Sequence, residues 1–315
     1  QTGARSTGLH LHSTLALTAE GVPLGVLDAN CQAPPARGAD DQRTSANIPI
    51  EQKKTFDWIQ GLRQCEQAAA RMPQTRLVSV MDREADVFEL FDEQRRRNKV
   101  DLLVRAKHDR LTAEQRTLFE QMRSGPVRSR LAIAVPRQSS RPKKSKSQAR
   151  VGHPKRLAQV QLRYREVVLP APKHHAGKPP LRLWVVHVRE TRAPAGAARL
   201  EWFLLSTREI TTVEQACECL RWYCLRWRIE DWHRVLKSGC RVEALQHKTA
   251  TRLKRAIAFN LVIAWRIMLL TLLGRQAPEL PADVLFSDLE IEVLQAYAKK
   301  TASNDPFCSA RPSSS

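Results

Sequence analysis

Hydrophobic and polar residues alternate along residues 9–17 (LHLHSTLAL), and a second run of strand-forming residues covers 22–28. Alternation with this spacing indicates strands, and the intervening Glu20 and Gly21 favour a turn. The two runs therefore predict a β-hairpin. The residues that follow, 33–49, are rich in proline and polar side chains and predict a loop.

The next segments change between helical and extended patterns. Residues 51–71 predict a helix, and 77–81 (LVSVM) form a short apolar run that predicts a buried strand. A second helix is expected over 85–97 and a second strand over 100–106. This order of strand, helix and strand is typical of an α/β core with a mixed sheet.

The composition changes after residue 122. Residues 123–182 hold 16 Lys or Arg residues and a single acidic residue, Glu166, and so carry most of the net positive charge of the chain. The centre of this segment, 139–150 (SSRPKKSKSQAR), has no apolar period and predicts a mobile loop. Strands are expected on either side of the loop and beyond it, over residues 157–169, 181–189 and 202–206.

Helical periodicity returns at residue 212 and continues to about residue 273. Its most apolar part, 256–273, is interrupted by Asn260 and Arg266 and lacks the 18 or so uninterrupted apolar residues of a membrane span, so it predicts a buried helix. A weaker helix is expected over 287–299, and the Ser-rich end, 309–315, is expected to be disordered.

These changes divide the chain into four parts. Residues 1–122 form the first part of an α/β core, 123–206 a β-rich basic insertion, and 207–275 the helical remainder of the core. Residues 276–315 form a partial C-terminal helical region with a tail.

The charge of the chain indicates a polyanionic partner. Lys and Arg number 52 against 32 Asp and Glu, which gives a formal net charge of +20 and a pI of about 10.3. Without a spanning segment, nucleic acid is favoured over a membrane. The seven Cys residues show no paired CxxC spacing, which argues against a disulfide framework or a zinc module and fits a reducing cytoplasm. Residues 1–8 lack the apolar core of a signal peptide, and a chain that begins at Gln1 is expected to begin inside a domain.

A segment with unusual polar residues covers 222–237 (WYCLRWRIEDWHRVLK). On a regular helix, Tyr223, Arg226, Glu230 and Lys237 share an arc of about 60°, away from the apolar stripe. Glu230 is then placed to hold a metal ion, and the two cations and the Tyr223 hydroxyl to bind phosphates of a nucleic-acid backbone. The alternative is an ordinary amphipathic helix with an ion pair between Arg226 and Glu230.

A second candidate carboxylate, Asp82, directly follows the predicted strand 77–81. Open α/β sheets bind their ligands at the carboxyl ends of strands, which makes Asp82 a candidate site residue. The alternative is that Asp82 caps the helix that follows.

The sequence SVMDREADVFELF around Asp82, followed by Tyr223-x2-Arg226-x3-Glu230-x6-Lys237, resembles the DDE transposases of bacterial cut-and-paste insertion sequences, in the insertion-sequence-four group that includes the transposon-five enzyme. The resemblance implies a ribonuclease H-like mixed-sheet core, interrupted by the basic insertion and followed by C-terminal helices. It also implies two Mg²⁺ ions, which Mn²⁺ can replace, held by carboxylates for cleavage and strand transfer at phosphorus. Asp82 matches the second catalytic acid and Glu230 the third.

The resemblance also implies partners and contacts. The partners are double-stranded DNA at the transposon ends, target DNA and a second copy in a synaptic homodimer, in the bacterial cytoplasm with the nucleoid. Tyr223, Arg226 and Lys237 match phosphate-binding residues, and Trp202 matches an aromatic residue that stacks on a flipped base, although a core tryptophan is the alternative. A further basic segment contains Arg105, Lys107, His108 and Arg110. The resemblance implies that this segment contacts end DNA, and the alternative is a solvated basic loop.

The first catalytic Asp of the family belongs on a strand before the predicted hairpin, and residues 1–8 contain no acidic residue. Asp28 lies in a segment that resembles a later strand and is not assigned to this role. The chain as given is therefore expected to be deficient in catalysis unless further residues precede it. The alternatives to an active transposase are an inactive DNA-binding remnant or inhibitor and a general nucleic-acid chaperone. Residues 278–299 resemble the beginning of the family's C-terminal dimerisation region.

Overall fold

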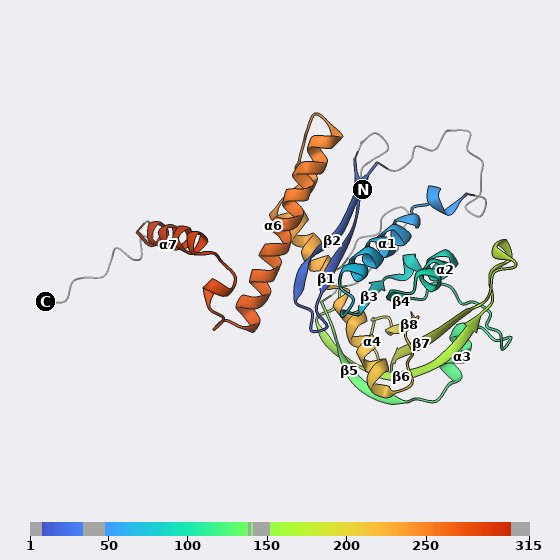
Figure 1. Ribbon diagram of the computed structural model, residues 1–315. Coiled ribbons are helices and arrows are strands. Elements are labelled where there is room, and N and C mark those ends of the chain that lie inside the picture. Colours follow the sequence, from blue (N-terminus) through green and yellow to red (C-terminus); the bar gives the residue numbers. More distant parts are fainter. Residues whose placement is uncertain (1–7, 34–47, 138–139, 141–151, 304–315) are drawn as a thin grey trace.

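The computed structural model describes residues 8–33, 48–137, 140 and 152–303. Within these residues the chain forms a mixed α/β structure with a curled six-stranded sheet, a separate two-stranded hairpin and C-terminal helices (Figure 1). Most of the predicted basic loop 139–150 and the whole tail 309–315 lie outside the described residues.

The predicted N-terminal hairpin is confirmed. Strand β1 (His10–Leu17) pairs antiparallel with β2 (Pro23–Gln32), which continues beyond the predicted end at residue 28. At the turn, Gly21 has a φ of 93°, a conformation that glycine adopts without steric cost. The hairpin is a sheet of its own and pairs with no other strand in the described part of the chain.

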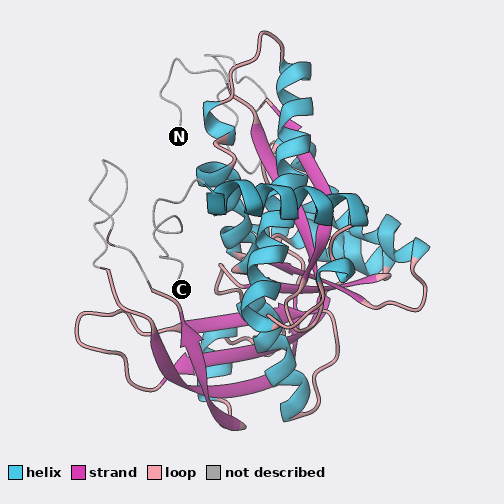
Figure 2. Ribbon diagram, turned by 90° about the vertical axis from the view of Figure 1, so that its left-hand side faces the viewer, coloured by secondary structure: helices cyan, strands magenta, loops and turns pink. Residues whose placement is uncertain are grey.

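The main sheet has the strand order β3-β4-β8-β7-β6-β5. Only β3 and β4 are parallel, and every other neighbouring pair is antiparallel. The sheet is curled, and its long strands lie together in the lower part of Figure 2. The strands are β3 (Leu77–Met81), β4 (Val100–Arg105), β5 (Ser129–Val135), β6 (Arg156–Leu169), β7 (Leu181–Glu190) and β8 (Glu201–Ser206).

The predicted strands are confirmed, and β5 was not predicted. The strands of the basic segment 123–206 join the same sheet as β3 and β4, because β8 pairs antiparallel with β4. That segment is therefore continuous with the core sheet. Sequence patterns miss such a connection because the pairing of β8 with β4 joins residues about a hundred positions apart.

Helices pack on both faces of the sheet at β4 and β8, whose residues are mostly buried, whereas β5 and β6 alternate between buried and more exposed residues. Helix α1 (Phe56–Arg71) and α2 (Phe88–Arg97) pack on one face, with Leu102 and Val104 beneath them. Helix α4 (Val213–Leu225) packs on the other face over Leu103. A short helix that was not predicted, α3 (Leu118–Ser124), packs against β6 and β7.

The region expected to be one helical stretch from 212 to 273 is divided into several helices. Helix α4 is followed by α5 (Arg228–Arg234), a π-helical turn (Val235–Gly239) and the long helix α6 (Ala250–Gln276). The last helix, α7 (Asp288–Ser303), agrees with the prediction for 287–299.

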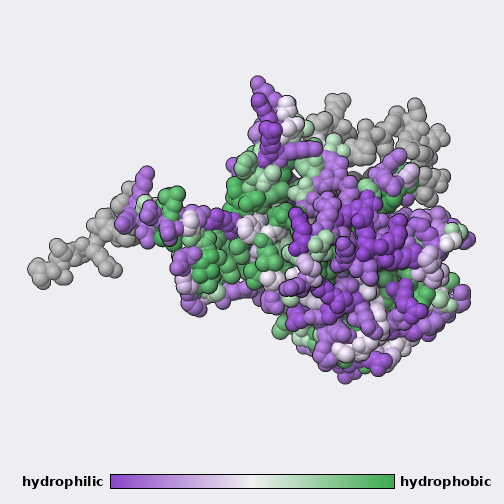
Figure 3. Space-filling model, viewed as in Figure 1, coloured by the Kyte–Doolittle hydropathy of each residue, from purple (hydrophilic) through white to green (hydrophobic). Residues whose placement is uncertain are grey.

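The prediction that 256–273 is a buried helix is wrong. Only one stripe of α6 is buried, and Phe259 on the opposite side is 74% exposed. Figure 3 shows the resulting apolar surface over α6. The prediction failed because an apolar helix is fully buried only when other elements cover all of its faces. In the described residues α6 packs mainly on β2 and the α5 region.

By length and composition α6 is also the one described helix that passes as a candidate membrane span. A single helix of this kind is weak evidence of a membrane span.

Candidate functional site

Asp82 lies directly after β3, at the carboxyl end of a strand, as predicted. Its Oδ1 accepts a hydrogen bond of 2.8 Å from the backbone N–H of Glu84 and so caps the 3₁₀ turn Arg83–Ala85. The capping alternative therefore also holds, although α2 itself begins only at Phe88. The second carboxylate oxygen takes part in no hydrogen bond or ion pair within the described residues.

The side of β3 on which Asp82 lies follows from the alternation of the strand. Val78 and Val80 pack against the cluster that contains Tyr223, beneath α4, whereas Met81 packs on the opposite side with α1. Successive side chains of an extended chain point to opposite faces, so Asp82 continues the face of Val80. The carboxylate is thereby directed toward the face of the sheet covered by α4.

The four polar residues of 222–237 do not lie on one unbroken helix, which corrects that part of the prediction, although Arg226 contacts both Tyr223 and Glu230. Helix α4 ends at Leu225 and α5 begins at Arg228, so a constant rotation of 100° per residue does not apply across the junction. Tyr223 is 2% exposed, while the side chains of Glu230 and Lys237 are 65% and 56% exposed.

Tyr223 and Trp202 belong to the hydrophobic core. Their rings form an edge-to-face pair with centroids 5.1 Å apart, and both side chains are buried between α4 and the sheet. Burying two large aromatic side chains stabilises the fold more than exposing them. The core alternative for Trp202 is therefore the arrangement found, and neither ring is exposed on the surface.

The charged residues near the junction form ion pairs. The Nη2 atom of Arg226 lies 3.3 Å from Oε1 of Glu230, as in the amphipathic-helix alternative, and the guanidinium stands over the Tyr223 ring at 5.7 Å. The Nε atom of Arg226 is buried without a hydrogen-bond partner. Lys237 Nζ lies 3.1 Å from Oε1 of Glu243. The pair of Lys237 and Glu243 is exposed on both sides and contributes little to stability.

Asp82 and Glu230 have separate interactions, and no hydrogen bond or ion pair joins them in the described part of the chain. No group of three or more His, Cys, Asp or Glu ligands gathers around either residue there. A site for two divalent ions requires more carboxylates than these two. The carboxylates of the described residues therefore do not fit a complete two-metal centre.

The basic loop after β4 is fixed by Asp86, a residue that sequence reasoning did not single out. The Asp86 side chain is 0% exposed, and its Oδ2 accepts hydrogen bonds from the backbone N–H groups of Lys107 (2.7 Å) and His108 (3.1 Å). Arg110 Nη2 lies 2.6 Å from Asp86 Oδ1 and donates to the Asp86 carbonyl. The sequence feature that could have indicated this role is the second Asp of the segment 82–86 (DREAD).

The predicted basic residues of this loop differ in accessibility. The side chains of Lys107 and His108 are exposed, because Asp86 holds only their backbone. Arg105 is half-buried at the end of β4, and Arg110 is committed to Asp86. Lys107 and His108 are therefore the side chains of this set that are placed to meet a ligand from solvent.

The hairpin docks against the helices that carry Arg226 and Glu230. Ser13 Oγ lies 3.1 Å from Nε2 of His233 on α5, and burial, with a smaller effect of Lys237, lowers the pKa of His233. The turn contacts the end of α4, where a Cβ added to Gly21 would lie 2.6 Å from Cδ2 of Leu225.

Replacing Gly21 with Ala is expected to lower the free energy of unfolding by about 2 kcal/mol, because the positive φ becomes unfavourable and Leu225 must move. Gly196 provides the matched control, since it also has a positive φ, 74°, but no atom lies within 4 Å of an added Cβ. Urea denaturation of Gly21→Ala and Gly196→Ala should show the larger loss for Gly21→Ala. Equal losses would contradict the packing role of the turn.

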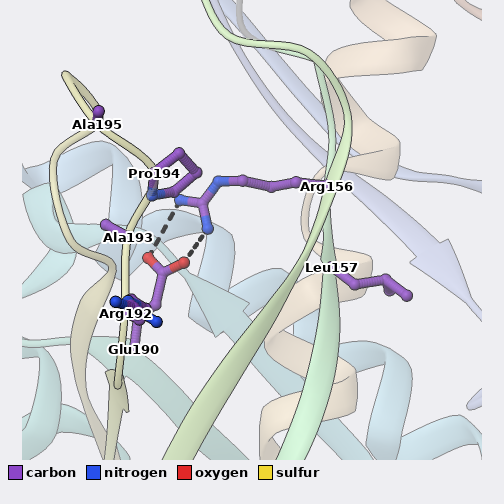
Figure 4. Close-up of a pocket in the computed structure, with 7 residues that line it drawn as sticks. All are labelled: Arg156, Leu157, Glu190, Arg192, Ala193, Pro194 and Ala195. Atoms are coloured by element: carbon purple, nitrogen blue, oxygen red, sulfur yellow. Dashed lines mark hydrogen bonds and ion pairs between the residues drawn. The ribbon is translucent and has the colours of Figure 1, made fainter.

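A cavity of about 370 Å³ lies away from these residues, next to Arg156 and Leu157 at the beginning of β6 and the residues after β7 (Figure 4). Arg156 and the buried Glu190 form a bidentate ion pair in its wall, and Glu190 also accepts from the Leu200 N–H at 3.0 Å. The carboxylate is thus fully engaged, and the cavity lining offers no nucleophile.

No family model matches this sequence.

Proposed function

We propose that this chain is part of a DNA transposase that cleaves and joins transposon ends, with Asp82 and Glu230 as two of the carboxylates of its active site. The observation that carries the proposal is the position of Asp82 at the end of β3, directed toward the face covered by α4, the helix that leads into the segment of Arg226 and Glu230. In a ribonuclease H-like core these carboxylates come from separate segments of the chain.

The edges of the two sheets support a core of this kind. Both β1 and β3 have a strand partner on one side only within the described residues, and α1 packs against β2 as well as against β3 and β4. Strand β3 has no charged residue, whereas strands at an exposed sheet edge commonly carry charged residues that prevent pairing with another strand. Two free edges beneath one helix fit a ribonuclease H-like sheet that lacks the strand expected to carry the first catalytic Asp.

The proposal assigns DNA contacts to cations around this face. The exposed Lys107 and His108, held on the Asp86 loop, and Arg226 and Lys237, from the segment of Glu230, would contact phosphates of the end DNA. Tyr223 and Trp202 would support Arg226 from the core, because neither ring reaches the surface.

Divalent magnesium, when bound by a complete set of carboxylates, would activate the attacking oxygen and stabilise the leaving oxygen. The residues of this chain would supply two ligands, Asp82 and Glu230, and would position the phosphates. DNA partners, a homodimeric synaptic complex and a cytoplasmic location remain parts of this proposal.

A second candidate function is a DNA-binding transposase remnant that occupies transposon ends without cutting them. It is favoured by the incomplete donor set at Asp82 and Glu230. Cleavage of end DNA by this chain in the presence of Mg²⁺ would exclude the remnant, whereas binding without cleavage would support it.

Glu230→Gln, in a chain extended at its N-terminus to include the expected first strand, should reduce cleavage at least about 100-fold through loss of a metal ligand. DNA binding should be retained, because Glu230 adds negative charge to the surface. Glu120→Gln on α3 is the matched control, since Glu120 is also an exposed helical glutamate that pairs with an arginine four residues earlier. The assay is cleavage of labelled end DNA beside a binding titration, and equal loss of binding and cleavage would argue against a ligand role.

A further inference from the structure

A group of three potential metal ligands lies outside the proposed site. Glu89 is in the first turn of α2, and His174 and His175 lie in the 3₁₀ turn Lys173–His175 between β6 and β7. One carboxylate oxygen and one nitrogen from each ring all lie within 4.8 Å of one another. Residues 85 positions apart are thus brought together at the end of the sheet where α2 meets the β6–β7 connection (Figure 1).

The closest two of these atoms are not joined by a well-formed hydrogen bond. His175 Nε2 lies 3.1 Å from Oε1 of Glu89, yet this nitrogen is buried and has no hydrogen-bond partner of acceptable geometry. Two ligands of a tetrahedral zinc ion, with bonds of about 2.0–2.1 Å, stand about 3.3 Å apart and point at the ion instead of at each other. The separation of the two atoms matches that arrangement.

Neighbouring side chains hold the ligands in place. The ring of His175 stacks on Phe88 with centroids 5.1 Å apart, and the ring of His174 lies 4.5 Å from that of His175. Glu89 and His175 are both mostly buried, whereas His174 faces solvent. The group therefore has two fixed ligands and a third on the side from which an ion would enter.

The ammonium group near these ligands is already paired. The ammonium of the nearby Lys178 is bound to Asp92 at 2.7 Å, so its charge is compensated locally.

We propose that Glu89, His174 and His175 bind a zinc ion, with the fourth position open to water. Two imidazoles and one carboxylate are a donor set typical of Zn²⁺, and a set that Mg²⁺, which prefers oxygen ligands, does not favour. The ion would fasten the β6–β7 connection to α2, where Arg95 already donates to the carbonyl of Pro179 at 2.9 Å. This site is independent of the proposed transposase activity and of its magnesium ions.

The test is calorimetric titration of the untagged, chelator-treated full chain with ZnCl₂. One equivalent of Zn²⁺ should bind, and His174→Ala and Glu89→Gln should each weaken the binding at least about tenfold. His247→Ala is the matched control, since His247 is an exposed histidine distant from the group in sequence, and it should bind as the unaltered chain does. Co²⁺ in place of Zn²⁺ should give the intense visible absorption of a tetrahedral site, and His174→Ala should remove it.

Two outcomes would overturn the proposal. The first is the absence of a one-equivalent binding step. The second is a zinc-binding step that His174→Ala leaves unchanged. In that case the group would be only an ion pair between His175 and Glu89. Because His174 is exposed, its replacement should leave the unfolding temperature in chelator unchanged, so a loss of zinc binding is separable from a loss of folding. DNA binding in chelator tests the proposed function separately.

Discussion

Raising the salt concentration from 50 to 200 mM should weaken the binding of this chain to a short DNA duplex by about three orders of magnitude. A protein that neutralises about six phosphates releases their counterions, and the logarithm of its affinity then falls with the logarithm of salt with a slope near −5. The net charge of +20 supplies more than enough cations for six contacts. The binding is measured by fluorescence anisotropy at several salt concentrations, in chelator so that metal sites do not contribute.

Removing one positive charge from the proposed DNA interface should make this slope less steep by about one. Lys107→Gln and Lys237→Gln should each reduce the slope by about one phosphate contact, because both side chains are exposed on the proposed interface. Lys299→Gln, an exposed lysine on α7, is the matched control and should leave the slope unchanged. A slope near zero for the unaltered chain would contradict nucleic-acid binding of any kind. Equal affinity for transposon ends and unrelated duplexes would favour the general chaperone.

Replacing Asp86 with Ala should lower the free energy of unfolding by about 3 kcal/mol. The substitution removes the acceptor of two backbone N–H groups, at Lys107 and His108, and leaves the guanidinium of Arg110 without its buried partner. Urea denaturation measures the loss. Glu84→Ala, in the same turn but exposed, is the matched control and should change stability little.

Asp86→Asn should separate the contribution of the hydrogen-bond acceptor from that of the negative charge. The amide oxygen still accepts the N–H groups of Lys107 and His108, so the loss should be about 1 to 2 kcal/mol. DNA binding by Asp86→Ala at a temperature where it remains folded should fall as well, because the basic loop is no longer held. Unchanged binding would mean that the loop does not contact DNA.

The regular elements were largely predictable because each has its own local pattern. The hairpin, β3, β4 and the strands β6 to β8 follow from alternation or short apolar runs, and α7 from its helical period. Helix α3 was missed because its seven residues are too few to establish a helical period, and the short apolar run of β5 was not recognised beside the basic loop.

The candidate site was only partly predictable. Asp82 at the end of β3 follows from the sequence, because a strand that ends at an acidic residue is a local feature. The unbroken helix predicted to carry Tyr223, Arg226, Glu230 and Lys237 was wrong, although Arg226 does lie against both Tyr223 and Glu230. The break after Leu225 occurs where the hairpin turn docks, and that contact joins residues about two hundred positions apart.

The sequence by itself determined the local elements, the strong positive charge and the position of Asp82 at a strand end, because each depends on neighbours along the chain. The tertiary structure alone decided that Tyr223 and Trp202 are core residues and that Asp86 holds the basic loop. It also decided that Glu89 meets two histidines and that one side of α6 stays exposed. Burial and such meetings depend on which distant segments pack together, and no periodicity along the chain records that choice.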